Sequence, residues 1–455
     1  MPVRSTKSAG ESPPGHKSQA IQHIALSRLK GRKGDPRRHS DSDLERAMGV
    51  VAALPRDALL PVIINGSNEI LIGGLLVEAA RKLGWTHMNV VCQDGLSPVE
   101  ESQYSIALNQ LLTLGHWDAA DFEASLREFE ATIEDFSHAT LGFANGELDR
   151  ILGITAADEG VGAEDSVPEV QQLPVSQPGT LWRVGRHSVF VGDATRVDAV
   201  AQLMGEHTAA LAFTDPPFGC KIDGFVSARG KHREFVDGSG MSPEQMRVLF
   251  HGFVQTLTHV LRKGALVYVF IDWRSQAVLQ QVLEGFFGPL VQFCVWVKDR
   301  AGMGSFYRSR HELVLIHRMP GAPHVNNVQL GRNGRNRSNV WEYPSAASSR
   351  TGREGDMLDN HPTPKPVELV ADAILDCTAH GDRVIDPFLG SGTTLMAAER
   401  TGRICHGMEL DPLYADVAIR RWQAWTGLDA IDAATGRTFN DIAADAALQG
   451  GQNDE

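Results

Sequence analysis

The stretch VIDPFLGSGTTL, residues 384–395, decides the fold because it joins a short apolar strand to a helix through a turn with two glycines. Gly390 and Gly392 let the backbone turn tightly and keep side chains out of the way of a ligand. The helix that follows directs its unpaired N–H groups toward this turn. The next strand closes with Glu409, 19 residues after Gly390. In dinucleotide-type sites an acid near this offset accepts hydrogen bonds from ribose hydroxyls, so the stretch predicts a ligand that carries a nucleoside.

Strand and helix signals alternate around this turn. Residues 404–410 predict a strand, and residues 411–427 predict a helix with Asp411 as its N-cap and Pro412 in its first turn. Such units predict an α/β, Rossmann-like fold with a doubly wound, mostly parallel sheet. The missing third glycine disfavours NAD, whereas S-adenosylmethionine has no phosphate and needs only the first part of the turn. A glycine turn that merely packs a helix onto a strand is the alternative, and Glu409 counts against it.

A second stretch, AALAFTDPPFG at residues 209–219, ends an apolar strand in a carboxylate, two prolines and an aromatic ring. Asp215 is expected at the carboxyl edge of the sheet, where open α/β folds bind ligands. The prolines fix φ and offer carbonyl oxygens without N–H donors, so Asp215 and the Pro216 carbonyl form a pair of acceptors for an exocyclic NH₂ group. Phe218 offers a flat face for stacking. A plain proline turn with Phe218 in the core is the alternative.

Composition limits the classes of protein to which the chain can belong. The 455 residues allow two or three domains, and the net charge is −13. Five cysteines are scattered without a C-x-x-C pair, which argues against a zinc site and a disulfide framework, so no metal is expected. No apolar run reaches the ~18 residues of a membrane span, and the N-terminus lacks the apolar core of a signal peptide. A cytoplasmic location is therefore expected.

An acidic stretch rich in Gly, Pro, Ser and Gln divides the chain and predicts a flexible linker. The expected order is a disordered tail, a smaller α+β N-terminal domain, the linker, a larger C-terminal domain and a C-terminal tail. Their ranges are 1–19, 20–153, 154–180, 181–430 and 431–455.

Residues 181–430 resemble the S-adenosylmethionine-dependent DNA amino-methyltransferases of the permuted, beta-type motif order, in which D-P-P-F/Y precedes the glycine turn. Six segments occur in the order of that family, and GMELDPLY follows them. They are GRHSVFVGDAT (185–195), TDPPFG (214–219), CVWVKDRAGMGSFYRSRHELVLIH (294–317), GRNRSNVWEYP (334–344), HPTPKPVEL (361–369) and DPFLGSGTT (386–394).

The resemblance implies that S-adenosylmethionine is the cofactor. It places Glu409 on the ribose, Asp193 at the adenine end, and Thr363 and Lys365 where the chain closes over the methionine end. Asp193 as a turn residue and Lys365 as a solvated lysine are the alternatives. The residues implied to surround the cofactor are Asp193, Thr363, Lys365, Asp386, Phe388, Gly390, Ser391, Gly392, Thr393, Thr394 and Glu409.

The resemblance also implies direct, in-line methyl transfer to an exocyclic amino nitrogen of a base flipped out of DNA. Asp215 and the Pro216 carbonyl would accept the two amino hydrogens, and Phe218 would stack on the base. The catalytic residues implied are Asp215, Pro216, Pro217 and Phe218. The aspartate of the D-P-P motif favours adenine N6 as the methylated atom, and cytosine N4 is the alternative target. A second alternative is a ParB-like DNA-binding or regulatory protein with an inactive methylase half.

Binding to double-stranded DNA, the expected partner, requires local positive charge in this acidic chain. Between Lys298 and Glu354 there are ten Lys and Arg against four Asp and Glu, a balance of +6. A target-recognition region is expected at about residues 318–360, with an ordinary arginine-rich loop as the alternative. The DNA contacts predicted are Arg308, Arg310, His311, Arg332, Arg335, Arg337 and Asn339.

Residues 20–153 resemble a ParB-type, nuclease-like domain. The resemblance is carried by IQHIALSRLKGRKGDPRRHSDSDLERAMGVV (21–51) and by EILIGGLLVEAARKLGW (69–85). In that family the glycine-rich element before the helix carries an arginine that contacts nucleotide phosphate, and here Leu76 stands at that place. An accessory or DNA-engaging module without nucleotide turnover is therefore expected. A homodimer is considered, and the sequence leaves the oligomeric state and any restriction partner open.

Overall fold

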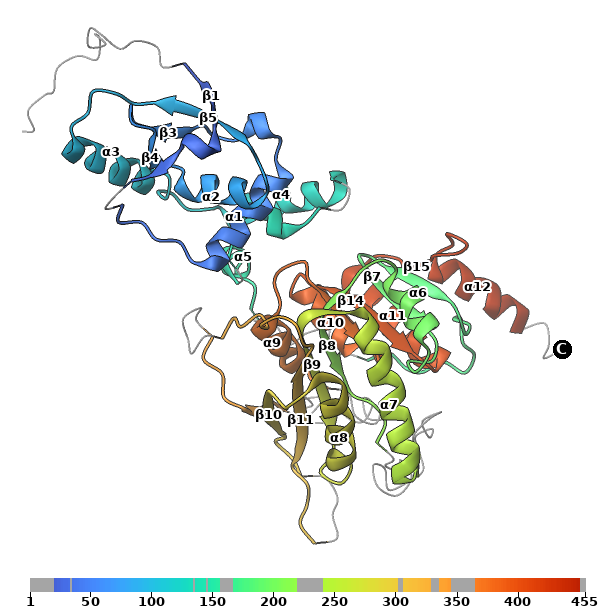
Figure 1. The fold of residues 1–455 in the computed structure, drawn as a ribbon. Helices are drawn as coiled ribbons and strands as arrows, with labels where there is room; N and C mark the ends of the chain where they lie inside the picture. Colours follow the sequence, from blue (N-terminus) through green and yellow to red (C-terminus); the bar gives the residue numbers. More distant parts are fainter. Residues whose placement is uncertain are drawn as a thin grey trace, which may run out of the picture. The chain divides into compact units, whose positions relative to one another are not determined.

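The computed structural model describes nine stretches of the chain and divides into two compact units, residues 1–144 and 145–455 (Figure 1). The stretches described are 20–32, 35–133, 136–144, 146–155, 167–218, 240–301, 306–328, 335–344 and 365–450. The division falls before the boundary expected at residue 153, because helix α5 (Glu147–Ile151) belongs to the second unit. There the buried Asp149 pairs with the fully buried Arg403 at 2.6 Å. Within these stretches, no helix has the length and apolar character needed to cross a membrane.

The first unit is built on a five-stranded sheet in the order β1-β5-β3-β4-β2. The strands are β1 (Gln22–Ala25), β2 (Lys30–Gly31), β3 (Val62–Ile64), β4 (Glu69–Ile72) and β5 (His87–Cys92). The helices are α1 (Asp41–Ala53), α2 (Gly74–Lys82), α3 (Pro98–Leu111) and α4 (Ala119–Thr132). Val62, Val77 and Val90 are fully buried and form the centre of its core.

Residues 62–72 form a hairpin, the antiparallel pair β3 and β4. Its turn is held by Asn65, whose Oδ1 accepts the backbone N–H groups of Ser67 and Glu69 at 3.0 and 2.9 Å. In the helix that follows, Leu76 packs against the core of this unit. The ParB-type resemblance of the unit stays a prediction.

The second unit is built on a ten-stranded sheet in the order β12-β10-β11-β9-β8-β13-β14-β7-β6-β15. Its strands are β6 (Leu181–Val184), β7 (His187–Val191), β8 (Ala209–Thr214), β9 (Leu261–Ile271), β10 (Gln292–Val297), β11 (His311–Arg318), β12 (Val340–Glu342), β13 (Arg383–Asp386), β14 (Ile404–Glu409) and β15 (Ile431–Asp432). Its further helices are α6 (Val197–Met204), α7 (Pro243–Val260), α8 (Gln276–Phe287), α9 (Val367–Cys377), α10 (Thr393–Arg400), α11 (Pro412–Thr426) and α12 (Phe439–Gly450).

The five central strands of this sheet, β9, β8, β13, β14 and β7, run parallel. Antiparallel pairs adjoin them on both sides, β11 with β9 and β6 with β7. The predicted α/β class with a doubly wound, mostly parallel core is therefore confirmed. Because parallel strands end at one edge, the residues that follow β8, β13, β14 and β7 are brought together there.

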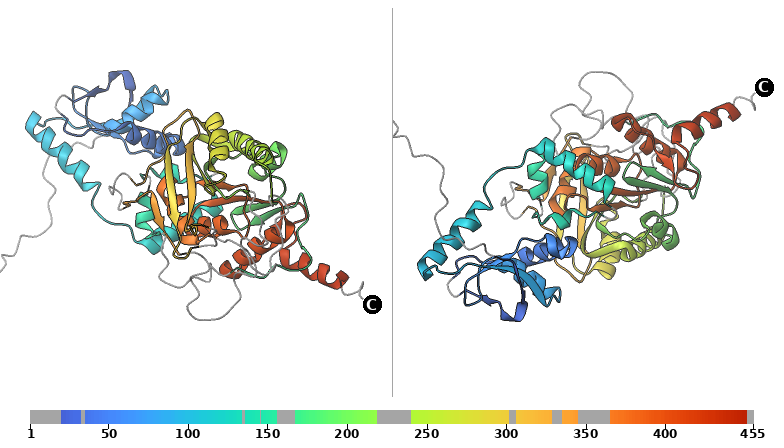
Figure 2. Two further views of the ribbon diagram at one scale, coloured as in Figure 1. Left: turned by 90° about the horizontal axis from the view of Figure 1, so that it is seen from below. Right: turned by 90° about the horizontal axis from the view of Figure 1, so that it is seen from above.

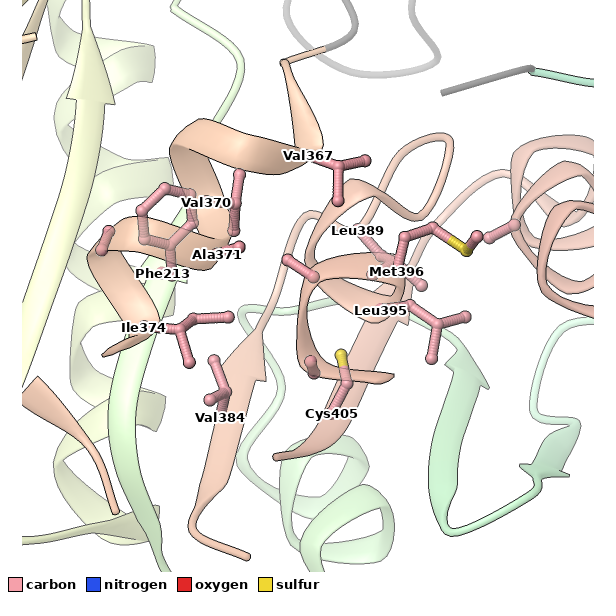
Figure 3. Packing of buried hydrophobic residues seen from close by; sticks show 14 of the residues in the cluster. Phe213, Val367, Val370, Ala371, Ile374, Val384, Leu389, Leu395, Met396 and Cys405 are labelled. Carbon is pink, nitrogen blue, oxygen red and sulfur yellow. The ribbon is translucent and has the colours of Figure 1, made fainter. Parts of the chain in front are cut away.

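Successive residues of the central strands face opposite layers of helices. Leu211 and Phe213 lie in the core formed with α9, α10 and α11, whereas Ala212 lies in the core formed with α6, α7 and α8. The views of Figure 2 show the two helix layers on opposite faces of the sheet. Figure 3 shows Val370 and Ile374 of α9 packed toward Phe213 of β8.

Two segments expected outside the C-terminal fold are part of it. Inside the predicted linker, the buried Val175 and Ser176 donate their backbone N–H groups to Asp416 at 2.6 and 3.0 Å. Inside the predicted tail, β15 pairs with β6, and the buried Phe439 meets Trp182 edge to face at 5.2 Å. Composition does not predict that these two segments belong to the fold, because a few buried residues are enough to hold an otherwise polar segment in place. Residues 156–166 of the linker lie outside the described residues.

Candidate active site

The carboxyl edge of the parallel strands collects four acids. Asp215 follows β8, Asp386 ends β13 and Glu409 ends β14. Asp193 lies two residues beyond β7, and the backbone N–H of Gly192 donates to the Glu409 carbonyl at 2.9 Å. These residues were expected at one site from the sequence, and the topology brings the strand ends that carry them together.

Asp386 is the brace of the glycine turn. Its Oδ1 accepts from the Thr214 hydroxyl at 2.9 Å and from the Phe388 N–H at 3.1 Å, and its Oδ2 accepts from the Thr394 hydroxyl at 2.6 Å. Burial raises the pKa of Asp386 to about 6, against the hydrogen bonds from Thr394, Phe388 and Thr214, which favour the carboxylate. Both oxygens are engaged within the protein, so this acid shapes the glycine turn.

Glu409 presents a carboxylate held by the backbone. Its Oε2 accepts the N–H of Gly390 at 2.8 Å, and its Oε1 accepts the N–H of Asp411 at 2.9 Å. Burial raises the pKa of Glu409 to about 7, although these two N–H groups favour the ionised form. Each oxygen retains a second lone pair, so the carboxylate can accept hydrogen bonds from a diol.

The turn itself has the backbone that only glycine adopts without strain. Gly390 and Gly392 have φ of 54° and 85°, and a Cβ on Gly392 would lie 2.8 Å from the Cβ of Ala418. The helix α10 begins directly afterwards, at Thr393. Arg421 of α11 supports this start, since its Nη1 donates to the Ser391 carbonyl at 3.0 Å.

Two further residues of the predicted cofactor set differ in their surroundings. Asp193 uses Oδ1 to accept from the N–H and hydroxyl of Thr195 at 2.8 and 2.7 Å, which is a turn contact that leaves Oδ2 for other partners. Phe388 is half-buried, edge to face with Phe253 at 5.2 Å. Thr363 lies outside the described residues.

Around Asp215 the two prolines and Phe218 form a half-buried turn. Pro216 is buried, and the Phe218 carbonyl accepts from the Ser275 hydroxyl at 3.3 Å. The Phe218 side chain is partly buried against the core on the α6–α8 side of the sheet. The turn is thus held beside the strand end that carries Asp215.

Lys365 lies beside Asp215. Its Nζ contacts Oδ2 of Asp215 and lies 3.0 Å from Oε2 of Glu312. Glu312, at the start of β11, also pairs with Lys298 at 2.5 Å. The other Asp215 oxygen, Oδ1, is buried and accepts no hydrogen bond from the described residues. This geometry makes Lys365 the partner of the acid at the D-P-P motif, and its place at the methionine end of the cofactor stays a prediction.

The charges in this network shift one another. Burial raises the pKa of Asp215, while the cation of Lys365 opposes that rise and the anion of Glu312 adds to it. Burial also disfavours the carboxylate of Glu312, but Lys365 and Lys298 outweigh it and lower the pKa of Glu312 to about 2. The two carboxylates in turn raise the pKa of Lys365 despite its burial.

Two arginines predicted to contact DNA have their charges paired inside the fold. Arg335 lies 2.8 Å from Asp372 and 2.7 Å from Asp376, and Arg337 lies 2.7 and 3.1 Å from the same two acids of α9. Their side chains are 21% and 20% exposed. This geometry argues against the predicted phosphate contacts and gives both arginines the role of tying residues 335–337 to α9. Sequence cannot reveal it, because Asp372 and Asp376 lie more than 30 positions away.

The other predicted DNA contacts that the structure describes lie around the β10–β11 connection and just before β12. Arg308, Arg310 and His311 are exposed beside it. Arg310 donates through Nε to the Lys298 carbonyl at 2.6 Å, and Arg308 donates to the Ala301 carbonyl at 2.9 Å. Asn339 donates to the Phe293 carbonyl at 3.1 Å and so joins the end of the sheet. Arg332 lies outside the described residues.

Sequence reasoning assigned no role to three residues of the site. Glu312 and Lys298 stand in the segment quoted for the resemblance. An acid at the start of the apolar run HELVLIH indicates a buried carboxylate, and a buried carboxylate needs a charged partner nearby. Arg421 is 2% exposed, but an arginine on an amphipathic helix is usually solvated, so its sequence carries no such signal.

The segment that contains this site is similar in sequence to known proteins. The family described as DNA methylase, of the N6/N4 methyltransferase type, matches residues 209–420, which include Asp215 and Glu409. The type II methyltransferase M2.DpnII of Streptococcus pneumoniae is 35% identical over 225 residues, 47% of this chain and 82% of that protein. The DNA adenine methyltransferase YhdJ of Escherichia coli (strain K12) is 26% identical over 253 residues, 49% of this chain and 80% of that protein. The crystal structure of the M1.HpyAVI–SAM complex is 20% identical with a TM-score of 0.37, and the match covers 51% of this chain and 97% of that one.

Proposed function

Because the chain belongs to the N6/N4 family of DNA methylases, we propose that it transfers a methyl group from S-adenosylmethionine to the exocyclic N6 of adenine in double-stranded DNA. The observation that carries this proposal is the difference between the two oxygens of Asp215. Oδ2 contacts Lys365, whereas Oδ1 is buried and accepts no hydrogen bond from the described residues. Leaving a buried acceptor unpaired costs about 1–3 kcal/mol. A bound amino group removes that cost.

The turn between β13 and α10 has the chemistry that S-adenosylmethionine needs. Glu409 is a backbone-held acceptor at the strand end, and in this proposal it accepts the ribose hydroxyls. Asp193, beyond the neighbouring strand, is assigned to the adenine end. Gly390 leaves the approach to Glu409 without a side chain. When bound, the cofactor supplies a methyl group on a positively charged sulfur.

The protein's part is to present the amino group in a reactive orientation. An amino nitrogen attached to a base is a weak nucleophile because its lone pair is conjugated with the ring. Hydrogen bonds to Oδ1 of Asp215 and to the Pro216 carbonyl draw the two hydrogens out of the ring plane, which frees the lone pair. The target base must leave the duplex at a cost of a few kcal/mol, and stacking on Phe218 offsets part of it.

The choice of adenine rests on the first residue of the D-P-P motif. Asp215 stands where a serine is more typical of the cytosine-N4 group. The similarity to YhdJ, whose name specifies adenine, supports the same choice. Cytosine N4 carries the same two-hydrogen donor and remains the alternative that product analysis separates.

For the DNA surface we propose the exposed residues beside the β10–β11 connection. Arg308 and Arg310 lie there with the exposed rings of Phe306 and Tyr307, which are 85% and 82% accessible. Cations contact phosphates and rings stack on bases, so this combination suits DNA. The connection leads directly into β11. Glu312 of that strand pairs with Lys365, the partner of Asp215, so the connection lies next to the proposed catalytic residues along the chain.

The test of the function is Asp215→Ala in the full-length protein. Unmethylated bacterial DNA and tritiated S-adenosylmethionine are the substrates, and calorimetry gives the cofactor Kd. The variant is expected to lose transfer by at least about 100-fold, the usual contribution of one positioned group in a transition state, with the cofactor Kd unchanged. Asp198→Ala, an exposed acid on α6, is the matched control and keeps wild-type activity. Equal activity of Asp215→Ala and wild type would refute the assignment.

A further inference from the structure

A chain of alternating charges crosses the sheet behind the D-P-P turn. Asp215, Lys365, Glu312 and Lys298 follow one another through three ion pairs. The Lys365 side chain is 8% exposed, and its Nζ also lies 5.0 Å from the Phe270 ring centroid and 5.7 Å from that of Trp296. The members come from four separate parts of the chain: the ends of β8 and β10, the start of β11 and the residue before Pro366 and α9.

Stability does not explain such a network well. Moving charges out of water costs several kcal/mol per ion, and apolar residues of similar volume often serve stability as well or better. We therefore expect the buried lysine beside two aromatic rings to serve function through the residue that it contacts. The group at its end is Asp215, whose second oxygen is buried and accepts no hydrogen bond from the described residues.

We propose, on the basis of the methyl transfer proposed above, that Lys365 is a positioning residue that fixes the Asp215 carboxylate with Oδ1 toward the substrate amine. Glu312 holds Lys365 in that place, and Lys298 in turn pairs with Glu312. The contact to Oδ2 stops the carboxylate from rotating and occupies one oxygen, so the amine meets a single defined acceptor. Without Lys365, both oxygens compete for the same donor and the acid gains a proton more readily.

The two neighbours of Asp215 act on its ionisation in opposite directions. Among the described residues, the charged groups that face it are Lys365 before α9, Glu312 on β11, Lys298 after β10 and Asp386 at the end of β13. The cations favour the carboxylate, and Glu312 disfavours it. Removing Lys365 must therefore raise the pKa of Asp215, and removing the charge of Glu312 must lower it. A residue with a merely structural role produces no such pair of opposite shifts.

The experiment compares full-length wild type with Lys365→Met, Glu312→Gln and Lys298→Met. Initial rates of tritium transfer to unmethylated plasmid DNA are measured from pH 5 to 9 and give kcat/KM, and calorimetry gives the cofactor Kd. Lys263→Met is the matched control, because Lys263 is exposed at the start of β9, the opposite edge of the sheet from Asp215. Thermal melting shows that each variant is folded, and Lys298→Met, which removes the partly exposed end of the network, serves if Lys365→Met does not fold.

We expect the acid limb of kcat/KM to move up by about one pH unit in Lys365→Met, the size expected for losing an opposite charge in contact. It moves up by less in Lys298→Met, moves down in Glu312→Gln and stays in place in Lys263→Met, with the cofactor Kd within about twofold throughout. Reduced rates with an unmoved acid limb would overturn the proposal, and so would a tenfold higher cofactor Kd in Lys365→Met, because that result makes Lys365 a cofactor ligand. Absence of transfer by the wild type would instead refute the methyl-transfer function on which the proposal rests.

Discussion

At the scale of single residues, three carboxylates at one sheet edge differ because of their partners. Asp386 has three hydrogen bonds inside the protein and braces the turn. Glu409 is held by two backbone N–H groups and keeps lone pairs for a ligand. Asp215 has a cation on one oxygen, and its second oxygen is buried and accepts no hydrogen bond from the part of the chain that the structure describes. The same chemical group therefore braces the turn at Asp386, and we propose that it accepts hydrogen bonds from the cofactor at Glu409 and from the substrate at Asp215.

Glu409→Gln tests the assignment of the ribose acceptor. Burial raises the pKa of Glu409 to about 7, so in the unliganded protein the carboxylate gains a proton as the pH falls through that value. The cofactor Kd of the wild type is expected to rise as the pH falls from 8 to 6. At pH 8 the variant should bind about tenfold more weakly, as for a lost hydrogen bond to a charged group, and its Kd should not vary with pH.

Calorimetric titration of S-adenosylmethionine at several pH values measures both effects. Glu206→Gln, an exposed acid in the loop after α6, is the control and should match the wild type. If Glu409→Gln and the wild type bind equally at pH 8, the ribose assignment fails.

At the scale of elements, the arginines that lie close together in the sequence differ in whether their charge is paired with an acid of the fold. Arg335 and Arg337 are tied to Asp372 and Asp376 of α9, so their charge is neutralised inside the fold. Arg310, beside the β10–β11 connection, instead bonds a neutral backbone carbonyl through Nε. The local excess of positive charge along the sequence therefore overstates the unneutralised positive charge in this region.

The double variant Arg308→Ala/Arg310→Ala tests the β10–β11 connection as a DNA contact. Each lost phosphate contact should lower the slope of log K against log salt by about 0.9, so affinity falls most at low salt. Fluorescence anisotropy with a labelled duplex over a salt series measures this.

The matched control is Arg183→Ala/Arg437→Ala, which removes the same charge at the opposite end of the sheet. That variant should bind as the wild type does. Identical salt slopes for both double variants would rule out the connection as a phosphate-binding element.

At the scale of the whole molecule, the second unit is larger than the segment that the motifs delimit. Residues before it, through Asp149 and Arg403, and residues after it, through β15 and α12, are built into the same fold. Arg403 is fully buried, with guanidinium contacts to Asp149 at 2.6 and 2.8 Å. Breaking a buried pair of this kind costs about 3–5 kcal/mol, so α5 is a fixed part of this unit.

Sequence predicts the parts of this protein that depend on local pattern. The glycine turn, the helix that begins after Gly392 and the acids at the strand ends follow from spacing alone, and the structure has the parallel sheet they require. Contacts between distant residues are different. The pairing of Lys365 with Asp215 joins residues 150 positions apart, and no periodicity encodes it. The anchoring of Val175 by Asp416 escaped prediction for the same reason.

The product nucleoside is the most direct test of the central claim. Wild-type protein and Asp215→Ala are each incubated with unmethylated bacterial DNA and S-adenosylmethionine, the DNA is digested to nucleosides, and the products are identified by mass spectrometry. We expect the wild type to form the 2′-deoxynucleoside of N6-methyladenine and the variant to form none. N4-methylated deoxycytidine would contradict the choice of base, and DNA without any methylated base would contradict the proposed activity.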